Sequence, residues 1–375
     1  MLQARAHFDQ GLAHWQSGQL AEAEQAFAQA HALAPERPSV LTNLGAVRAA
    51  MGRVGEAVEL LGRATQLEPD NVEAWGHLGA SLAELGRFAD ALQALERTLQ
   101  LRPDAWAALR HKASVLRELG RLDASAQCLE QLHAAGAGDE LSHYMLAAVR
   151  SGAVRAAGAA PAEAPVTAPA GYVEGLFDRY ADEFSDHLDA LHYRAPQVLA
   201  EGAARCLCAP WPTVLDLGCG TGLMGRYLQP HAQRLDGVDL SARMVERARQ
   251  SGYYAEVMHS DLHAALAAAQ AQGRRYALVV SADVFIYVGA LERVFEGVNR
   301  ILLPGGGFAF SVELLAPGRG DFAVQPSLRY AHAQAYVERL AASHGLRVVQ
   351  LQHGPLREDQ RQAIAGLYGF LQAPA

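Results

Sequence analysis

The sequence predicts two domains of different fold class: an α-helical solenoid over residues 1–150 and an α/β domain with a seven-stranded, mostly parallel sheet over residues 172–375. Three observations lead to this prediction. The first half has a 34-residue period, residues 151–171 are mainly Ala, Pro and Gly, and the second half alternates short apolar runs with helical patterns. A length of 375 residues also suits two or three domains rather than one small core.

Composition and charge exclude several functional classes. Lys112 is the only lysine in the chain, so a Schiff-base lysine or a P-loop lysine elsewhere is excluded. The net charge of -8 is spread over two acidic halves, which disfavours a nucleic-acid partner because that affinity rests on Lys and Arg at phosphates. Four cysteines make no disulfide framework, and Cys206 with Cys208 supplies only half of a zinc site, so no metal is predicted. With no leader-like start and no long apolar run, we expect a cytoplasmic protein that does not enter a membrane.

The first half repeats one helical hairpin four times. Rows of small residues and prolines recur with a step of 34 residues, as expected where two helices pack closely and where the second helix ends: Gly11, Gly45, Gly79 and Ala113; Gly18, Gly52, Gly86 and Gly120; Pro35, Pro69, Pro103 and Ala137. This pattern resembles the tetratricopeptide repeat over residues 4–137, best in the third unit at Trp75, Leu78, Gly79 and Ala91. Residues 139–150 are expected to cap the array.

Solenoids of this family present a concave groove whose ligand depends on its lining. In the family's register the lining is small and mostly uncharged, and it includes Thr42, Gly76 and Arg110. The Lys and Asn cluster that clamps a carboxylate in chaperone-binding members is absent, which disfavours a chaperone adaptor. We expect the groove to bind a protein partner, to mediate self-association or to pack on the other domain.

Residues 151–171 have hardly a large apolar side chain to bury, so they predict a flexible linker. Beyond them the adjacent Leu176 and Phe177 are followed by Tyr180 and Phe184 at steps of three and four residues, which predicts an amphipathic helix. Tyr180 is expected either to close over a cofactor or to pack in the core. The apolar runs that predict strands follow at residues 213–217, 235–240, 255–259, 277–282, 307–314, 347–353 and 367–371.

The first of these runs leads into the glycine-rich loop Asp216-Leu217-Gly218-Cys219-Gly220-Thr221-Gly222. Alternate glycines let a ligand lie against bare main chain. A dinucleotide fingerprint wants a small residue where Leu223 stands, which disfavours a nicotinamide or flavin. Asp239 ends the second run, where a carboxylate can accept hydrogen bonds from both ribose hydroxyls, and Asp261 ends the third, placed for an adenine amine. A nucleoside without phosphate fits this pattern best.

This motif set resembles the class I S-adenosylmethionine-dependent methyltransferases, and the whole chain resembles bacterial predicted methyltransferases that carry tetratricopeptide repeats. The resemblance implies a Rossmann-like domain with S-adenosyl-L-methionine as cofactor. It implies these contacts: Asp216, Gly218, Cys219, Gly220 and Gly222 around the methionyl part, Asp239 at the ribose, Leu240 and Met244 beside the adenine, and Asp261 with Leu262 at its amine. Ser281 is expected at the same site, and Arg194 is expected to pair with the cofactor carboxylate.

The residues that bind the methyl acceptor are predicted from their places at the ends of strands. Ligands of open α/β sheets lie beyond the carboxyl ends of the strands, which singles out Asp283 and Tyr287 after the fourth run and Glu313 after the fifth. Arg329 and His332 precede the last helix, a usual place for a substrate loop. We expect Arg329 to hold an anion and His332 to remove a proton, the alternative being a surface loop whose His caps the helix.

Together these features predict a methyltransferase that acts on a small-molecule or protein acceptor, with repeats that recruit a partner or form an oligomer. Methyl transfer from a sulfonium needs mainly an aligned nucleophile and the exclusion of water. The alternative is a non-catalytic interaction protein whose second domain only binds the nucleoside. A nicotinamide oxidoreductase ranks third because of Leu223.

Overall fold

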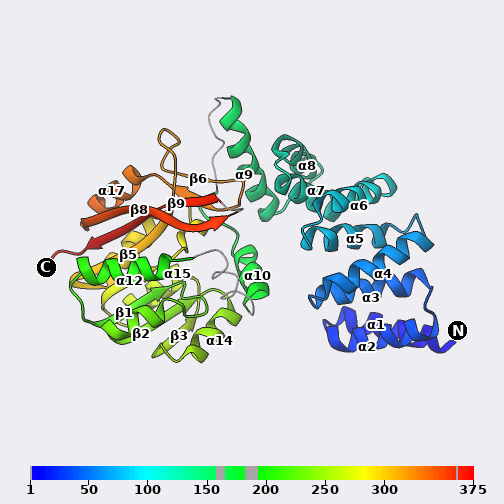
Figure 1. Ribbon diagram of the computed structural model, residues 1–375, viewed down its shortest axis with the longest axis horizontal. Coiled ribbons are helices and arrows are strands. Elements are labelled where there is room, and N and C mark those ends of the chain that lie inside the picture. Colours follow the sequence, from blue (N-terminus) through cyan, green and yellow to red (C-terminus); the bar gives the residue numbers. More distant parts are fainter. Residues whose placement is uncertain (1, 158–164, 182–192, 360–361) are drawn as a thin grey trace. The chain divides into compact units, whose positions relative to one another are not determined.

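The computed structural model describes residues 2–157, 165–181, 193–359 and 362–375. The chain divides into two compact units, Met1–Ala159 and Ala160–Ala375 (Figure 1). Among the described helices, none is both long and apolar enough to cross a bilayer. The cytoplasmic location stays a prediction.

Helical hairpins build the first unit. Each odd-numbered helix packs against the next even-numbered one, and each hairpin packs on its neighbour. The helices are α1 (Leu2–Gln16), α2 (Leu20–Leu33), α3 (Pro38–Ala50), α4 (Val54–Leu67), α5 (Val72–Glu84), α6 (Phe88–Leu101), α7 (Trp106–Glu118), α8 (Leu122–Ala134) and α9 (Glu140–Ala157). The predicted fold class of this half is confirmed.

The two glycine rows have different physical causes. Gly18, Gly52, Gly86 and Gly120 turn the hairpins with φ angles of 70° to 78°, a region that side chains rarely tolerate. Gly45 and Gly79 instead lie inside helices, where a Cβ would come within 2.7 Å of the Cγ atoms of Leu61 and Leu95. Close helix packing therefore depends on the absence of a side chain there.

Helix α9 packs on α8 where a cap was expected, and it buries Tyr144, Met145, Ala148 and Val149. It also continues beyond residue 150, so residues 151–157 are helical rather than flexible. Alanine is the strongest helix former, so an alanine-rich segment can be helical even without large apolar side chains. The prediction of a linker did not take this into account.

The other end of the predicted linker is also fixed. The Val166 carbonyl accepts hydrogen bonds from the amides of Gly289 and Ala290, both at 2.9 Å, and the Tyr330 hydroxyl donates to the Pro165 carbonyl. The prediction of a flexible linker over residues 151–171 was therefore wrong at both ends. Residues 151–157 are helical, and residues 165–166 are held by main-chain hydrogen bonds rather than by buried apolar side chains. Residues 158–164 lie outside the described residues.

A mixed sheet forms the centre of the second unit, with strand order β3-β2-β1-β4-β5-β7-β6, while β9 pairs with β5 and β8 with β9. The pairs among β1 to β5 and β5 with β7 are parallel, and the pairs β5–β9, β6–β7 and β8–β9 are antiparallel. The strands are β1 (Trp211–Leu217), β2 (Ala232–Asp239), β3 (Glu256–His259), β4 (Tyr276–Ser281), β5 (Leu302–Leu314), β6 (Phe322–Val324), β7 (Tyr330–His332), β8 (Arg347–Asp359) and β9 (Gln362–Gln372). The fold class is confirmed, but the sheet has nine strands in the described residues, because β6 and β7 are too short to give a sequence pattern.

Helices cover both faces of this sheet. One face packs on α15, α16 and α17 through a core rich in phenylalanine, and the other packs on α12 and α13. The helices are α10 (Ala170–Tyr180), α12 (Ala195–Cys206), α13 (Gly225–Leu228), α14 (Ala242–Ser251), α15 (Leu262–Ala271), α16 (Glu292–Ile301) and α17 (Gln334–Ser343), with short 3-10 helices η1 (Gln229–His231) and η2 (Phe285–Tyr287). The predicted opening helix is α10, and Phe184 lies outside the described residues.

Candidate functional site

The glycine-rich loop follows β1 at the carboxyl end of the sheet. Gly218, Gly220 and Gly222 have φ angles of 76°, 54° and 95°. The amides of Gly218 and Cys219 both donate to the Val238 carbonyl, at 2.8 and 2.9 Å. A Cβ on Gly218 would come within 2.2 Å of Val284 Cγ2, so the loop touches the turn after β4 with bare main chain.

Asp239 joins this loop to the next helix. Its Oδ2 accepts the Gly220 amide at 2.8 Å, and its Oδ1 accepts the Ser241 amide at 2.9 Å. Because a carboxylate has about four lone-pair sites, each oxygen can still accept a further hydrogen bond. Burial raises the pKa of Asp239, and the two amides oppose that shift. The residue therefore fits the predicted contact with two ribose hydroxyls.

Asp216, Cys219 and Ser281 are buried in or beside the glycine loop. Asp216 is 1% exposed and its Oδ2 accepts the Tyr254 hydroxyl at 2.7 Å. Burial raises the pKa of Asp216 to about 7, while the Tyr254 bond opposes this shift. Ser281 is buried and donates to the Leu217 carbonyl at 3.0 Å. Ser281 therefore fixes the end of β1, and direct contacts of Asp216, Cys219 and Ser281 with a cofactor stay predictions.

The side chains predicted at the adenine occupy two helix starts. Met244 is buried in the first turn of α14, and Leu240 is half-buried just before it. Asp261 is the N-cap of α15, with Oδ1 accepting the amides of His263 and Ala264 at 2.9 and 3.0 Å. Leu262 follows it, half-buried. Sequence reasoning missed this capping role, and the adenine contacts stay predictions.

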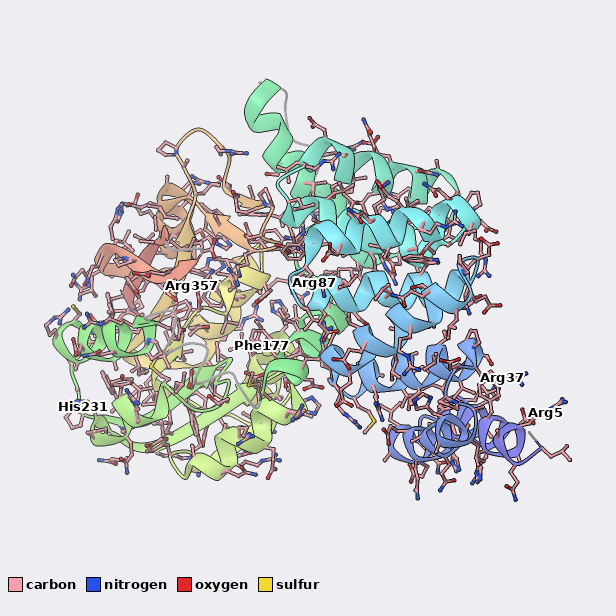
Figure 2. The ribbon with its side chains drawn as sticks, turned by 45° about the vertical axis from the view of Figure 1, so that its right-hand side comes forward. Arg5, Arg37, Arg87, Phe177, His231 and Arg357 are labelled. Carbon is pink, nitrogen blue, oxygen red and sulfur yellow. The ribbon has the colours of Figure 1, made fainter. Side chains whose placement is uncertain are left out.

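Helix α10 is tied to the site at two points. The Ser241 hydroxyl donates to Asp178, and Arg243 Nη1 donates to the Asp178 carbonyl at 2.8 Å. The ring of Phe177, which is labelled in Figure 2, stands edge-on to the Tyr287 ring, with centroids 5.5 Å apart. The helix thus contacts both the start of α14 and the turn after β4. The side chain of Tyr180 lies outside the described residues.

Charged side chains of opposite sign gather after β4, where the sequence places the acceptor, and we call Asp283, Glu313, Arg329 and Arg357 the acceptor-side cluster. Arg357, on β8, donates to Asp283 after β4 and to Glu313 at the end of β5. Arg329 lies close enough to Tyr287 and to Glu313 for its charge to oppose the raised pKa of each. Burial nevertheless raises the pKa of Tyr287 to about 12. The structure therefore brings together the predicted residues Asp283, Tyr287 and Arg329.

His332 does not join them. The predicted substrate loop is strand β7 at this point, and His332 is 0% exposed. Its Nε2 faces the carbonyl oxygens of Val288 and Gly289 at 2.9 and 3.0 Å, so this nitrogen carries the hydrogen. Burial lowers the pKa of His332 to about 4. The prediction of an exposed His on a loop was wrong, because β7 pairs with β5 and turns the ring inward.

Arg194 precedes α12 and is exposed. Its charge opposes the effect of burial, which raises the pKa of Tyr368 to about 12. The neighbouring Tyr193 has its pKa raised by burial and by the charge of Asp283. These residues lie near the acceptor-side cluster, and pairing of Arg194 with a cofactor carboxylate stays a prediction.

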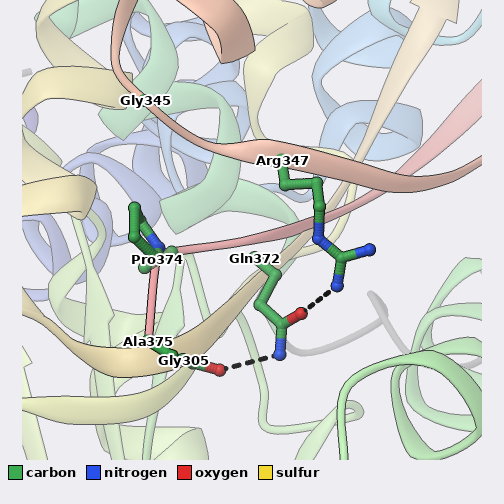
Figure 3. A pocket seen from close by; sticks show the side chains of 7 residues that line it. Gly305, Gly345, Arg347, Gln372, Pro374 and Ala375 are labelled. Atoms are coloured by element: carbon green, nitrogen blue, oxygen red, sulfur yellow. Dashed lines mark hydrogen bonds between the residues drawn. The ribbon is translucent and has the colours of Figure 1, made fainter.

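A separate pocket lies at the opposite end of the strands (Figure 3). It is lined by the start of β5 at Gly305 and by Arg347 and Gln372, where β8 begins and β9 ends. Gln372 Nε2 donates to the Gly305 carbonyl at 3.0 Å and its Oε1 accepts from Arg347. This pocket is not part of the glycine-loop site. Within the described residues, no group of three His, Cys, Asp or Glu side chains is arranged to hold a metal ion.

A glycine loop after β1, bonded to a carboxylate at the end of β2 and covered by helices on both sheet faces, defines a Rossmann-like nucleoside-binding domain of the class I methyltransferase type. Residues 214–306 match the family described as "Methyltransferase domain". Residues 14–82 and 78–140 match two families described as "Tetratricopeptide repeat". The chain therefore carries tetratricopeptide repeats and an S-adenosylmethionine-dependent methyltransferase domain, and both predictions are confirmed.

Two curated relatives and one solved structure are similar to parts of this chain. The malonyl-[acyl-carrier protein] O-methyltransferase of Salmonella typhimurium is 27% identical over 47% of this chain and 67% of that protein. The trans-aconitate 2-methyltransferase of Streptomyces coelicolor is 32% identical over 48% of this chain and 55% of that protein. A solved structure of the N-methyltransferase NodS from Bradyrhizobium japonicum aligns over 48% of this chain and 86% of that chain, with 19% identity and a TM-score of 0.38. The chain thus spans only about half to two thirds of the two curated relatives.

Sequence reasoning missed Arg357 and Tyr254. Neither stands in a motif, and each acts on a residue far away in the chain: Arg357 on Asp283, and Tyr254 on Asp216. Arg357 and Glu313 also lie beyond residue 306, where the family match ends. The acceptor-side cluster is therefore built partly from residues outside the shared domain.

Proposed function

We propose that this chain transfers the methyl group of S-adenosyl-L-methionine to the carboxylate of an acid, either a small molecule or a group carried by a protein. The observation that supports the cofactor is Asp239, which holds Gly220 and the start of α14 while keeping lone pairs for a ribose. The cofactor supplies a methyl group already activated on its sulfonium. The chain has to hold the acceptor in line and exclude water.

An acidic acceptor is supported by the charges that face the acceptor side. Arg329 lies beside Tyr287, and a guanidinium pairs well with a carboxylate. Two relatives, the malonyl-[acyl-carrier protein] O-methyltransferase and the trans-aconitate 2-methyltransferase, are named for substrates that are acids. A carboxylate is already ionised near neutral pH, so its methylation needs no base. This agrees with a Tyr287 that stays protonated and with the inward-facing His332.

In this proposal Arg329 binds the acceptor carboxylate and Tyr287 donates a hydrogen bond that orients it. Phe177 packs on the Tyr287 ring from α10 and helps to exclude water. His332 has no place in the reaction. Its ring fixes the main chain of residues 288–289 behind Tyr287.

The repeats are proposed to bind a protein partner through the face formed by α3, α5 and α7, which pack in sequence. Two charges near the predicted groove are used within the unit, since Arg110 pairs with Asp139 and Glu73 pairs with Arg102. Thr42 is buried, with its hydroxyl donating to the Pro38 carbonyl at 2.8 Å, so it does not line a groove as predicted. Partner recognition therefore depends on the less charged remainder of this face.

The cofactor assignment is tested by calorimetry with S-adenosylhomocysteine and with 5′-methylthioadenosine, which share the adenosine part. Asp239→Ala removes the ribose acceptor, so both affinities are expected to fall together by about 1.5–3 kcal/mol, the range for hydrogen bonds to a charged group. Asp321→Asn, which removes an exposed carboxylate paired with Arg339, serves as control. Equal affinity of the wild type and Asp239→Ala would overturn the assignment.

The acceptor is tested by incubating cell extract with labelled methyl donor and separating small molecules from proteins. Arg329→Ala is expected to lower the turnover of the labelled acceptor at least tenfold and to leave S-adenosylhomocysteine binding unchanged, because only the second ligand loses its partner. Arg339→Ala, an exposed arginine on α17, is the matched control. A labelled product that resists mild alkali is not an ester, and it would refute carboxylate methylation.

A further inference from the structure

Asp283 is held in an unusual backbone conformation directly after β4. Its φ is 60°, in the left-handed region that residues other than glycine seldom adopt. Its amide donates to the hydroxyl of Ser311 on β5 at 2.9 Å, and Ser311 is fully buried. Neighbouring strands thus impose this conformation on Asp283, and such strain concentrates at functional sites.

Arg357 fixes the side chain of Asp283 as well as that of Glu313. The guanidinium donates through Nη1 to Asp283 Oδ2 and through Nη2 to Glu313 Oε1. The side chains are 3% exposed for Arg357, 13% for Asp283 and 9% for Glu313. Two carboxylates share one guanidinium, so this triad has an excess negative charge.

Among the described residues, the second carboxylate oxygen of Asp283, Oδ1, is left without a hydrogen-bond donor, although it is buried. A buried carboxylate oxygen without a donor is costly, so a donor is expected to arrive with a ligand. Arg357 cannot supply it, because its contact with Asp283 is made to Oδ2.

Asp283 lies directly beside the glycine loop. Asp283 precedes Val284, whose side chain fills the space that a Cβ on Gly218 would need. The glycine loop and the turn after β4 are therefore in contact. Tyr193 lies near both carboxylates, since the charges of Asp283 and Asp216 both act on its hydroxyl.

We propose that Asp283 Oδ1, aimed by Arg357, accepts a hydrogen bond from the α-ammonium group in the amino-acid part of the bound cofactor. This inference rests on the proposed function. The sulfonium has no N–H or O–H to donate, and a carboxylate acceptor brings no donor at neutral pH, whereas an ammonium brings three. Asp283 is thus a cofactor-binding residue rather than the acceptor-side group predicted from the sequence, and Arg357 is a positioning residue.

The test compares two ligands that differ in this group. S-adenosylhomocysteine carries the α-ammonium, and 5′-methylthioadenosine has the same nucleoside without the amino-acid part. In Asp283→Asn the amide oxygen turns to Arg357, so the amide NH₂ replaces Oδ1 and faces the ammonium as a second donor. We expect S-adenosylhomocysteine to bind at least tenfold more weakly and 5′-methylthioadenosine to bind as in the wild type.

Arg357→Lys tests the positioning role with the charge retained. A lysine ammonium cannot bridge both carboxylates in the planar geometry of a guanidinium, so S-adenosylhomocysteine should again lose affinity while 5′-methylthioadenosine does not. Asp321→Asn is the control for loss of a carboxylate, and thermal unfolding without ligand checks that each variant is folded. If Asp283→Asn does not fold, Arg357→Lys alone tests the inference. The quantity compared is again the ratio of the affinities for S-adenosylhomocysteine and 5′-methylthioadenosine.

Each outcome separates this inference from the proposed function. If the wild type binds neither ligand, the proposed function fails and the inference fails with it. If the wild type binds both, unchanged affinities in the variants, or equal losses for both ligands, overturn the inference alone. Unchanged cofactor affinity with a raised KM for the acceptor would also overturn it, by assigning Oδ1 to the acceptor.

Discussion

The Tyr254 hydroxyl donates a hydrogen bond to Asp216 Oδ2 at 2.7 Å, across 38 residues of sequence. The Tyr254 ring lies against three positions where a side chain is missing. A Cβ on Gly222, Gly225 or Gly237 would come within 3.2, 3.0 or 2.9 Å of a ring carbon. The glycines of this region thus serve two purposes, since they allow the loop to bend and they make room for the ring that satisfies Asp216.

Burial gives Asp216 a pH-dependent effect on stability, which the Tyr254 contact opposes. Burial raises its pKa to about 7 in the folded chain, against about 3.9 in an unfolded one. The folded state therefore binds more protons between these values, so the free energy of unfolding falls as the pH rises from about 4 to about 7 and then levels off. Asp216→Asn removes this titration and can keep the Tyr254 contact.

We expect the melting temperature of Asp216→Asn, relative to the wild type, to rise steadily between pH 5 and about pH 7.5. Thermal unfolding without ligand at a series of pH values measures it. Asp321→Asn should show a difference that hardly changes with pH, because that carboxylate is exposed. A difference for Asp216→Asn that is equally flat would mean that Asp216 is ionised in the folded chain throughout this range.

The contact between the glycine loop and the turn after β4 predicts a strong effect of Gly218→Ala. The new Cβ would lie 2.2 Å from Val284 Cγ2, and φ would remain at 76°. The clash and the left-handed backbone together should cost about 2–4 kcal/mol of stability and weaken binding of 5′-methylthioadenosine. Val284→Ala in the same chain removes the clash but not the backbone strain, so it should restore part of the stability. No restoration would show that strain alone accounts for the loss.

In the repeats, two glycines inside helices should respond in opposite directions to alanine. Gly79→Ala would place a Cβ 2.7 Å from Leu95 Cγ, and we expect a loss of about 1–3 kcal/mol from overpacking. Gly62 lies in α4 with no atom within 4 Å of an added Cβ, so Gly62→Ala should stabilise by about 0.5–1 kcal/mol. Urea unfolding followed by helical circular dichroism measures both. The same sign for the two variants would contradict the packing argument.

Sequence reasoning succeeded where the determining contacts recur or are local. The 34-residue period and the glycine loop are visible because the residues that need each other stand at fixed steps or side by side. It failed for His332, whose partners Val288 and Gly289 lie more than 40 residues away, and for Arg357, which reaches Asp283 across 74 residues. No local pattern encodes such pairs, since strand order in the sheet brings them together.

The linker failed for a different reason, and that reason can be tested. The amino-acid composition shows only which side chains could be buried. Residues 165–168 are instead held by their main chain, through the Val166 carbonyl, the Ala168 amide and the Pro165 carbonyl. A fragment of residues 165–375 should therefore unfold at a higher temperature than one of residues 170–375, although the extra residues add little apolar surface. Each lost hydrogen bond is worth about 0.5–1.5 kcal/mol.

Tyr330→Phe separates this anchoring from a general effect of chain length. Its hydroxyl donates to the Pro165 carbonyl, which only the longer fragment contains. We expect the substitution to cost the longer fragment about 0.5–1.5 kcal/mol more than the shorter one, because only the longer fragment contains the Pro165 carbonyl. Urea unfolding of the four proteins closes this double-mutant cycle. An equal cost in both fragments would show that the Tyr330 hydroxyl is not what holds residue 165.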